Sequence, residues 1–153
     1  MGRQRFSWTG TLFLALLFAG CGEDTVVDPP AVDLVAPFVG TWDAEVFTVT
    51  NDANTSQVAD LMLDGSFTMN VQPSGTYTAT LLFGDLSPII EIGVLRPSES
   101  GTVTLQPTGG DPATSVFVFE REDYLTLDGP TDFDFNLDGT PEEAQAYIEL
   151  QRR

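Results

Sequence analysis

Apolar and polar side chains alternate with a period of two along most of the chain after residue 38. In the segment 66–72, for example, Phe67, Met69 and Val71 share one face, and hydroxyl and amide side chains occupy the other. Successive side chains of a β-strand point to opposite faces, so this period predicts strands rather than helices. The expected strands are 38–50, 57–64, 66–72, 75–84, 88–96, 101–107, 115–121, 123–128, 132–137 and 144–152.

Short segments rich in glycine, proline, aspartate and serine separate these expected strands. Such segments form the tight turns of antiparallel hairpins. Their regular spacing predicts an all-β, antiparallel up-and-down meander that closes into a β-barrel, with a β-sandwich as the alternative. The turn signals are Asp64-Gly65, Pro73-Ser74-Gly75, the segments 97–101 and 109–112, Asp128-Gly129-Pro130 and Asp138-Gly139.

The first 20 residues have a different pattern, with a short basic start followed by an apolar run. The uninterrupted apolar part, residues 12–19, is too short for a membrane-spanning helix of about 20 residues and is typical of a signal peptide. The stretch Leu17-Phe18-Ala19-Gly20-Cys21 resembles the lipobox of bacterial lipoproteins. This resemblance implies a signal peptide over residues 1–20 that is removed, and a diacylglycerol group on the thiol of Cys21.

Residues 21–37 are expected to form a flexible tether that carries the lipidated cysteine. Acidic residues and three prolines in this segment favour solvated, extended backbone. Several acyl chains on one residue give stable anchoring, so the resemblance implies a partner in the membrane itself. Gly22 stands where an aspartate in such lipoproteins often retains the protein at the inner membrane. We therefore expect a cell-envelope protein at the outer membrane, facing the periplasm or the cell surface.

Charge strengthens the case for a covalent anchor. The chain has 23 acidic residues and six basic ones, all of them arginine, and a net charge of −17. Loss of Arg3 and Arg5 with the signal peptide makes the net charge about −19. Such a surface repels nucleic acid and anionic lipid headgroups, because binding to either depends on Lys and Arg. We expect no nucleic-acid partner, and solubility is the simplest role of the acidity.

The segment Phe38-Val39-Gly40-Thr41-Trp42 at the start of the first expected strand resembles the Gly-x-Trp signature of lipocalins and of lipocalin-like domains in bacterial lipoproteins. The resemblance implies a lipocalin-like barrel over residues 38–153. It also implies structural roles for Gly40, which would allow close packing, and for Trp42, which would plug the closed end. A cation from the last strand, Arg152 or Arg153, would stack on the tryptophan.

Catalytic residue types are scarce. The chain has no histidine, and its single cysteine is Cys21. A serine nucleophile would lack its usual base, and zinc and copper would lack their preferred ligands. Two carboxylates suffice for glycoside hydrolysis, but no pair stands out among 23 acidic residues. We therefore expect a protein without enzymatic activity and with no resident cofactor apart from the cation considered next.

The segment 134–143 begins like a calcium-binding loop, with oxygen-bearing side chains at alternate positions followed by a glycine. Gln145 stands where such loops carry a bidentate glutamate. The alternative is a plain hairpin turn at Asp138-Gly139, with the other polar side chains in solvent. The candidate calcium ligands are Asp134, Asn136, Asp138, Thr140 and Glu142.

Two function classes remain open. In the first, the barrel is a binding module that holds a small apolar ligand among its aromatic side chains. In the second, the barrel core is filled and the molecule is a structural or interaction lipoprotein, with an unknown protein partner. A roomy interior would favour the first class, and a packed interior with an exposed apolar patch the second. The candidate lining residues are Phe47, Phe67, Tyr77, Phe83, Phe117, Phe119, Phe133 and Phe135.

Overall fold

The computed structural model describes residues 33–84 and 87–153. The expected signal peptide, Cys21 and the tether as far as residue 32 lie outside the described residues. In the described ranges, no helix is long and apolar enough to cross a membrane.

Nine strands and one short 3-10 helix make up the regular structure of the described residues. The 3-10 helix η1 is Ala36–Phe38. The strands are β1 Gly40–Asn51, β2 Val58–Asp60, β3 Gly65–Val71, β4 Thr76–Phe83, β5 Ile89–Pro97, β6 Thr102–Pro107, β7 Ala113–Arg121, β8 Tyr124–Phe133 and β9 Glu142–Arg152.

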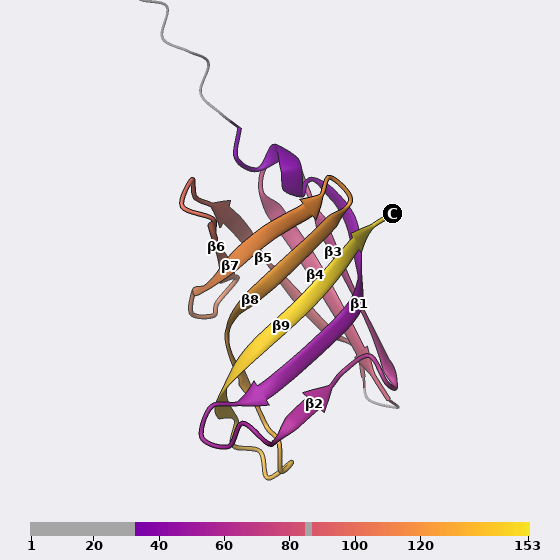
Figure 1. Ribbon diagram of the computed structural model, residues 1–153, viewed down its shortest axis with the longest axis vertical. Helices are drawn as coiled ribbons and strands as arrows, with labels where there is room; N and C mark the ends of the chain where they lie inside the picture. Colours follow the sequence, from indigo (N-terminus) through magenta and orange to yellow (C-terminus); the bar gives the residue numbers. More distant parts are fainter. Residues whose placement is uncertain (1–32, 85–86) are drawn as a thin grey trace, which may run out of the picture. The chain divides into compact units, whose positions relative to one another are not determined.

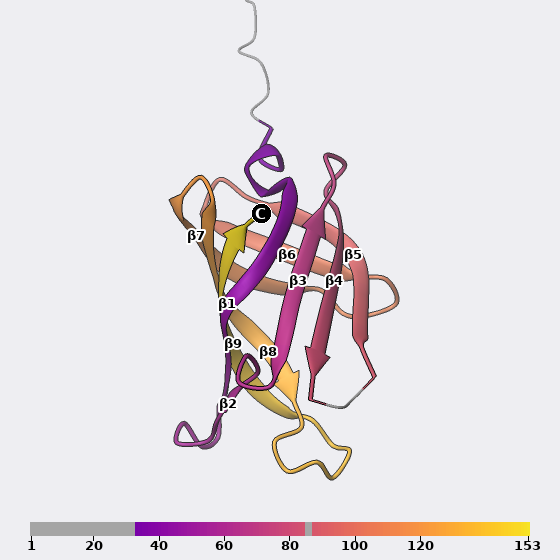
Figure 2. The same ribbon diagram turned by 90° about the vertical axis from the view of Figure 1, so that its right-hand side faces the viewer.

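The strands form a closed antiparallel barrel, as the spacing of the turn signals predicts. From β3 to β9, each strand pairs with the next, and β1 pairs with both β3 and β9, which closes eight strands into one sheet. The short strand β2 is an addition, because it pairs only with the second half of β1. Figures 1 and 2 show η1 and the C-terminus at one end of the barrel, and β2 with the β8–β9 loop at the other.

The end of the barrel next to η1 is filled by side chains, and we call it the closed end. Phe38 and Trp42 are almost fully buried there. The indole N–H of Trp42 donates to the carbonyl oxygen of Phe38 over 2.7 Å, so the buried donor is satisfied. Phe117 and Phe119 contact the Phe38 ring edge-on, with centroids 4.9 and 5.0 Å away. A separate small cluster around Val49, Leu61 and Ala144 is buried elsewhere in the barrel.

Strand β8 corrects the expected boundaries. The segments 123–128 and 132–137 were predicted as two strands with a turn at Asp128-Gly129-Pro130, but β8 runs through this sequence without interruption. Strand β7 pairs with β8 only as far as Asp128, whereas β9 pairs along its whole length. Beyond Gly129, which still contacts Ser115 of β7, β8 therefore has one edge without a paired strand, where Pro130 is tolerated.

The expected strand 57–64 is also shorter in the structure. Strand β2 ends at Asp60, whose carboxylate accepts a hydrogen bond from the backbone N–H of Met62 over 3.0 Å. Aspartate side chains that bond the backbone two residues ahead form a local turn, which competes with strand pairing. Leu61 is then free to turn inward, where it is buried.

Apolar and other residues alternate along β5 as expected for a strand, but the face that carries Ile90 and Ile92 points outward. Ile90 and Ile92 are 61% and 52% exposed, while Glu91 and Gly93 face the interior. Tyr77 of β4 lies opposite Gly93, and a Cβ on Gly93 would come within 2.7 Å of the tyrosine ring. The ring occupies the space that a side chain at position 93 would need, so the glycine face must be the inner one.

Candidate ligand cavity

A cavity of about 400 Å³ occupies the barrel interior away from the closed end. Its walls are mainly apolar, and every strand except β2 contributes to them. The volume lies in the range of small-molecule binding sites, about 300–1,000 Å³. The apolar lining includes Phe47, Val49, Leu61, Phe67, Met69, Leu81, Ile89, Leu105, Leu127, Phe133 and Ile148.

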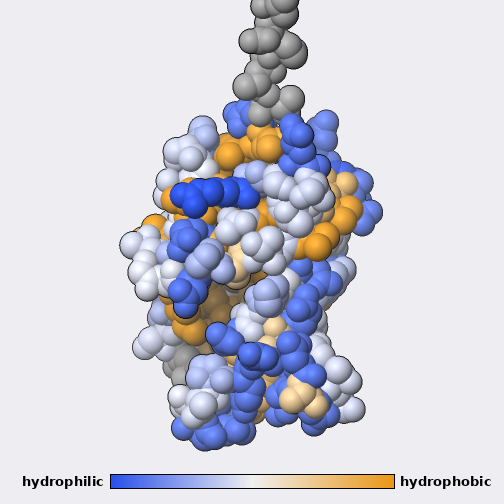
Figure 3. All heavy atoms as spheres, turned by 90° about the vertical axis from the view of Figure 1, so that its left-hand side faces the viewer, coloured by the Kyte–Doolittle hydropathy of each residue, from blue (hydrophilic) through white to orange (hydrophobic). Residues whose placement is uncertain are grey.

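The cavity has an opening in the side of the barrel, which we call the mouth. Strand β6 pairs with β5 only from Gly93 onward, and the backbone N–H of Thr108 donates to the carbonyl oxygen of Ile92, so residues 89–91 have no strand partner on that side. On the opposite flank, the pairing of β8 with β7 stops at Asp128. Gly129 still lies against Ser115 of β7, but residues 130–133 have no strand partner on that side. Both unpaired stretches line the same cavity. Figure 3 faces the side that carries β6 and β7, and shows apolar atoms recessed below a mostly hydrophilic surface.

Two polar side chains form the main polar feature of the cavity wall. The hydroxyl of Tyr77 donates a hydrogen bond to the carboxylate of Glu91 over 2.5 Å. Burial, this hydrogen bond and the negative charge of Glu91 together raise the pKa of Tyr77 far above its usual value of 10.0. Tyr77 is buried, whereas Glu91 reaches solvent at the mouth. The tyrosine therefore stays neutral and holds the carboxylate in place.

The aromatic residues singled out in the sequence divide between the cavity and the packed parts of the barrel. Phe47, Phe67, Tyr77 and Phe133 line the cavity. The remaining four pack against buried residues, two of them at the closed end: Phe117, Phe119, Phe83 and Phe135. Phe47, Phe67 and Phe133 pack against the buried clusters as well, so core filling and cavity lining coexist in one barrel.

The Gly-x-Trp segment lies at the closed end, under the last strand. The guanidinium carbon of Arg152 is 4.4 Å from the centre of the Trp42 ring, and an N–H of the same group donates to the carbonyl oxygen of Pro37. Arg153 points elsewhere and pairs with Asp43. Gly40 has a φ of 137°, which side-chain-bearing residues rarely adopt, and it lies against the aliphatic part of Arg152.

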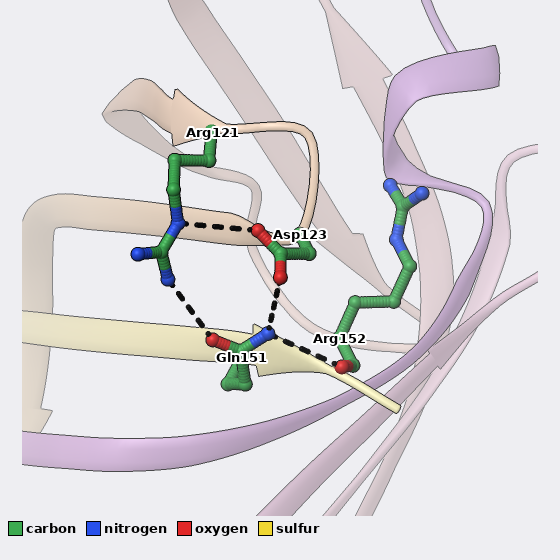
Figure 4. Close-up of polar contacts among 4 residues, drawn as sticks. All are labelled: Arg121, Asp123, Gln151 and Arg152. Atoms are coloured by element: carbon green, nitrogen blue, oxygen red, sulfur yellow. Dashed lines mark hydrogen bonds and ion pairs between the residues drawn. The ribbon is translucent and has the colours of Figure 1, made fainter.

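A network of polar side chains lies beside Arg152, at the rim of the closed end (Figure 4). Arg121 contacts Asp123 over 3.3 Å and Gln151 over 3.4 Å, and the Gln151 amide donates to Asp123 over 3.0 Å. The hydrogen bond from Gln151, with the charge of Arg121, lowers the pKa of Asp123. The Arg152 side chain points away from this network toward η1. The cations of the last strand thus lie far from the cavity mouth.

The candidate calcium ligands lie close in sequence at the other end of the barrel. Asp134, Asn136, Asp138 and Thr140 belong to the β8–β9 loop, and Glu142 begins β9. Among the described residues, no three His, Cys, Asp or Glu side chains are grouped so that they would hold a metal ion together.

The carboxylates of this loop bind groups of the loop itself. Asp134 accepts hydrogen bonds from the backbone N–H groups of Asp138 and Gly139, over 3.1 and 2.7 Å. Glu142 accepts from the backbone N–H of Phe135 over 3.0 Å. The connection is therefore longer than a plain Asp138-Gly139 turn and braced from within. Calcium binding stays a prediction, which a calorimetric titration of the protein with Ca²⁺ tests.

No protein-family model matches this sequence, and no curated protein matches it significantly. The fold therefore rests on the strand pairing, and the resemblances to lipoproteins and lipocalins stay predictions.

Proposed function

We propose that this chain is a non-enzymatic binding protein of the cell envelope, which carries a small apolar ligand in its barrel and is held at a membrane by lipid on Cys21. The observation that carries the proposal is the cavity of about 400 Å³ with its apolar walls and side mouth. A barrel with a filled core, the alternative, would leave no such space. The lipocalin-like arrangement of eight strands is compatible with a binding role.

Native mass spectrometry of the chain from residue 22 onward tests ligand binding. This chain contains the whole barrel and both buried clusters, so it keeps the structural unit. Purified without detergent, it should retain an apolar adduct or take up an added alkyl alcohol at one molecule per chain. As a control, Ala79→Phe, which places a bulky ring on the cavity wall, should lower uptake. A chain with no adduct and no uptake would contradict the binding role.

The membrane anchor needs a separate test on the full-length chain. Expressed in a bacterial host with labelled palmitate, the chain should incorporate label and appear in the membrane fraction. Cys21→Ser should abolish both, because the hydroxyl does not accept the lipid and no other cysteine exists. Equal labelling of the two proteins would contradict lipid attachment at Cys21. Equal ligand binding by both is expected, since the cavity lies within residues 47–148.

A further inference from the structure

We propose that the cavity selects apolar ligands with a positively charged head, such as alkyl amines, over ligands with a carboxylate head. The inference rests on the proposed binding role and deepens it, because it specifies the ligand's charge. The ligand's chain would lie among the apolar walls, and its ammonium group would meet Glu91 at the mouth.

The lining has acidic residues without basic ones. Among the described residues of the cavity wall, Glu91 and Asp132 are acidic, and none is Lys or Arg. An apolar cavity that takes carboxylic acids needs a donor or a cation for the carboxylate, since an unpaired charge leaves water at a cost. Here the group already in place at the mouth is an acid, which would repel a second one.

A hydrogen bond holds the Glu91 carboxylate in place, but no cationic side chain of the described residues pairs with it. Its hydrogen-bond donor is the neutral hydroxyl of Tyr77, and no ion pair of the described residues includes it. An ionised carboxylate has about four lone-pair sites, so several remain for a ligand. Because Tyr77 is buried and fixes one carboxylate oxygen, the direction of the free sites is set before a ligand arrives.

None of the arginines of the described residues lines the cavity. Arg152 covers Trp42 and Arg153 pairs with Asp43, both at the closed end. Arg121 pairs with Asp123 at the nearby rim. Arg96 lies opposite Thr104 on β6 and outside the cavity lining. The positive charge that would complement Glu91 is therefore expected from the ligand.

Calorimetric titration with three probes of equal chain length tests this assignment: decylamine, decanol and decanoate. They are added to the chain from residue 22 onward, below the concentration at which they form micelles. Decylamine should bind at least about tenfold more tightly than decanoate, with decanol between them, because a hydrogen bond to a charged group is worth about that factor. Binding of decanoate equal to or tighter than that of decylamine would overturn the proposal.

Two variants separate the Glu91 contact from the general attraction of an acidic protein for cations. Glu91→Gln keeps an acceptor for Tyr77 and should lower decylamine affinity about tenfold while leaving decanol affinity unchanged. Glu99→Gln removes the same charge from an exposed turn and should change neither. An equal effect of both variants on decylamine would overturn the assignment to Glu91. Failure of all three probes to bind would instead contradict the binding role itself, and the inference with it.

Discussion

At the scale of single residues, Arg152 makes several different contacts at the closed end of the barrel. Its guanidinium stacks on Trp42 and bonds Pro37, while its aliphatic part lies against Gly40. Its Nε is buried without a hydrogen-bond partner. The stacking and the packing stabilise the closed end, and the unpaired N–H offsets part of that gain.

Replacing Arg152 by methionine should lower the free energy of unfolding by about 1 kcal/mol, because the cation–π contact is lost while much of the packing is kept. Urea denaturation followed by Trp42 fluorescence measures the change in a chain without the signal peptide, where Trp42 is the single tryptophan. Arg153→Met is the matched control, since its ion pair with Asp43 is largely exposed and should contribute less than about 0.5 kcal/mol. An equal loss in both variants would argue against the Trp42 contact.

The three tyrosines predict how stability depends on alkaline pH. Hydrogen bonds to carboxylates raise the pKa of Tyr124, to about 12, and of Tyr147, and burial with Glu91 raises that of Tyr77. Each tyrosine therefore ionises earlier in the unfolded chain, near pH 10. Their contribution to stability is complete below pH 10 and is lost as the pH rises through 12.

Ultraviolet titration of tyrosinate in the folded protein should accordingly begin above pH 10, whereas the same titration in concentrated urea should centre near 10. Tyr77→Phe should remove the latest-titrating group and weaken the fall in stability between pH 10 and pH 12. A folded-state midpoint near 10 for all three would contradict the hydrogen bonds to Glu91 and Glu149.

At the scale of the element, β7 and β8 approach closely where Gly129 faces Ser115. A Cβ on Gly129 would lie 2.2 Å from the Ser115 hydroxyl oxygen and 2.8 Å from its Cα. The glycine that suggested a turn is thus needed for strand contact.

Gly129→Ala should lower the free energy of unfolding by about 2 kcal/mol, within the usual range for overpacking. Thermal unfolding followed by circular dichroism measures the loss. Ser115→Gly in the same chain should restore part of it, since it removes the two nearest atoms while the Cα remains. A double variant no more stable than Gly129→Ala would show that the strain arises elsewhere.

Individual strands also show where the alternation of apolar and polar residues is enough to predict which side chains face inward. The alternation in β3 correctly places Met69 and Val71 inside, because both neighbouring strands obey the same period. In β5 the pattern alone favours the isoleucines as the inner face, but the Tyr77 ring over Gly93 decides otherwise. Glu91 therefore escaped the sequence analysis as a cavity residue. The signal that would have found it is a glycine two positions after an acid, on the same face of the strand and opposite an aromatic residue of the neighbouring strand.

The sequence also contained a signal for which of Arg152 and Arg153 stacks on Trp42. Leu150 faces the core, and the period of two then sends Arg152 inward and Arg153 outward. No local feature of the sequence, by contrast, predicted the mouth in the side of the barrel. It arises because β6 and β7 are shorter at one end than β5 and β8, which depends on register across four strands.

At the scale of the molecule, closure depends on β9, which pairs with β1 on one edge and β8 on the other. Deleting residues 142–153 should abolish cooperative unfolding and expose apolar surface to a hydrophobic dye, because two strands lose their partner together. Deleting Arg153 alone removes one backbone hydrogen bond to Thr41 and one exposed ion pair. That shorter deletion should leave a cooperative transition, and the loss of cooperativity in both would indicate a wider fragility of the C-terminus.

The pairing of Trp42 with Arg152 also sets the order of events when the protein is made. Strand β1 cannot pair along one edge until β9 has been synthesised, so the barrel cannot close before residues 142–152 have left the ribosome. Contacts between residues this distant in sequence form slowly. Until β9 has been added, β1 and β8 each keep an unpaired edge, so the growing chain is most exposed to wrong pairing with other chains just before its last strand forms.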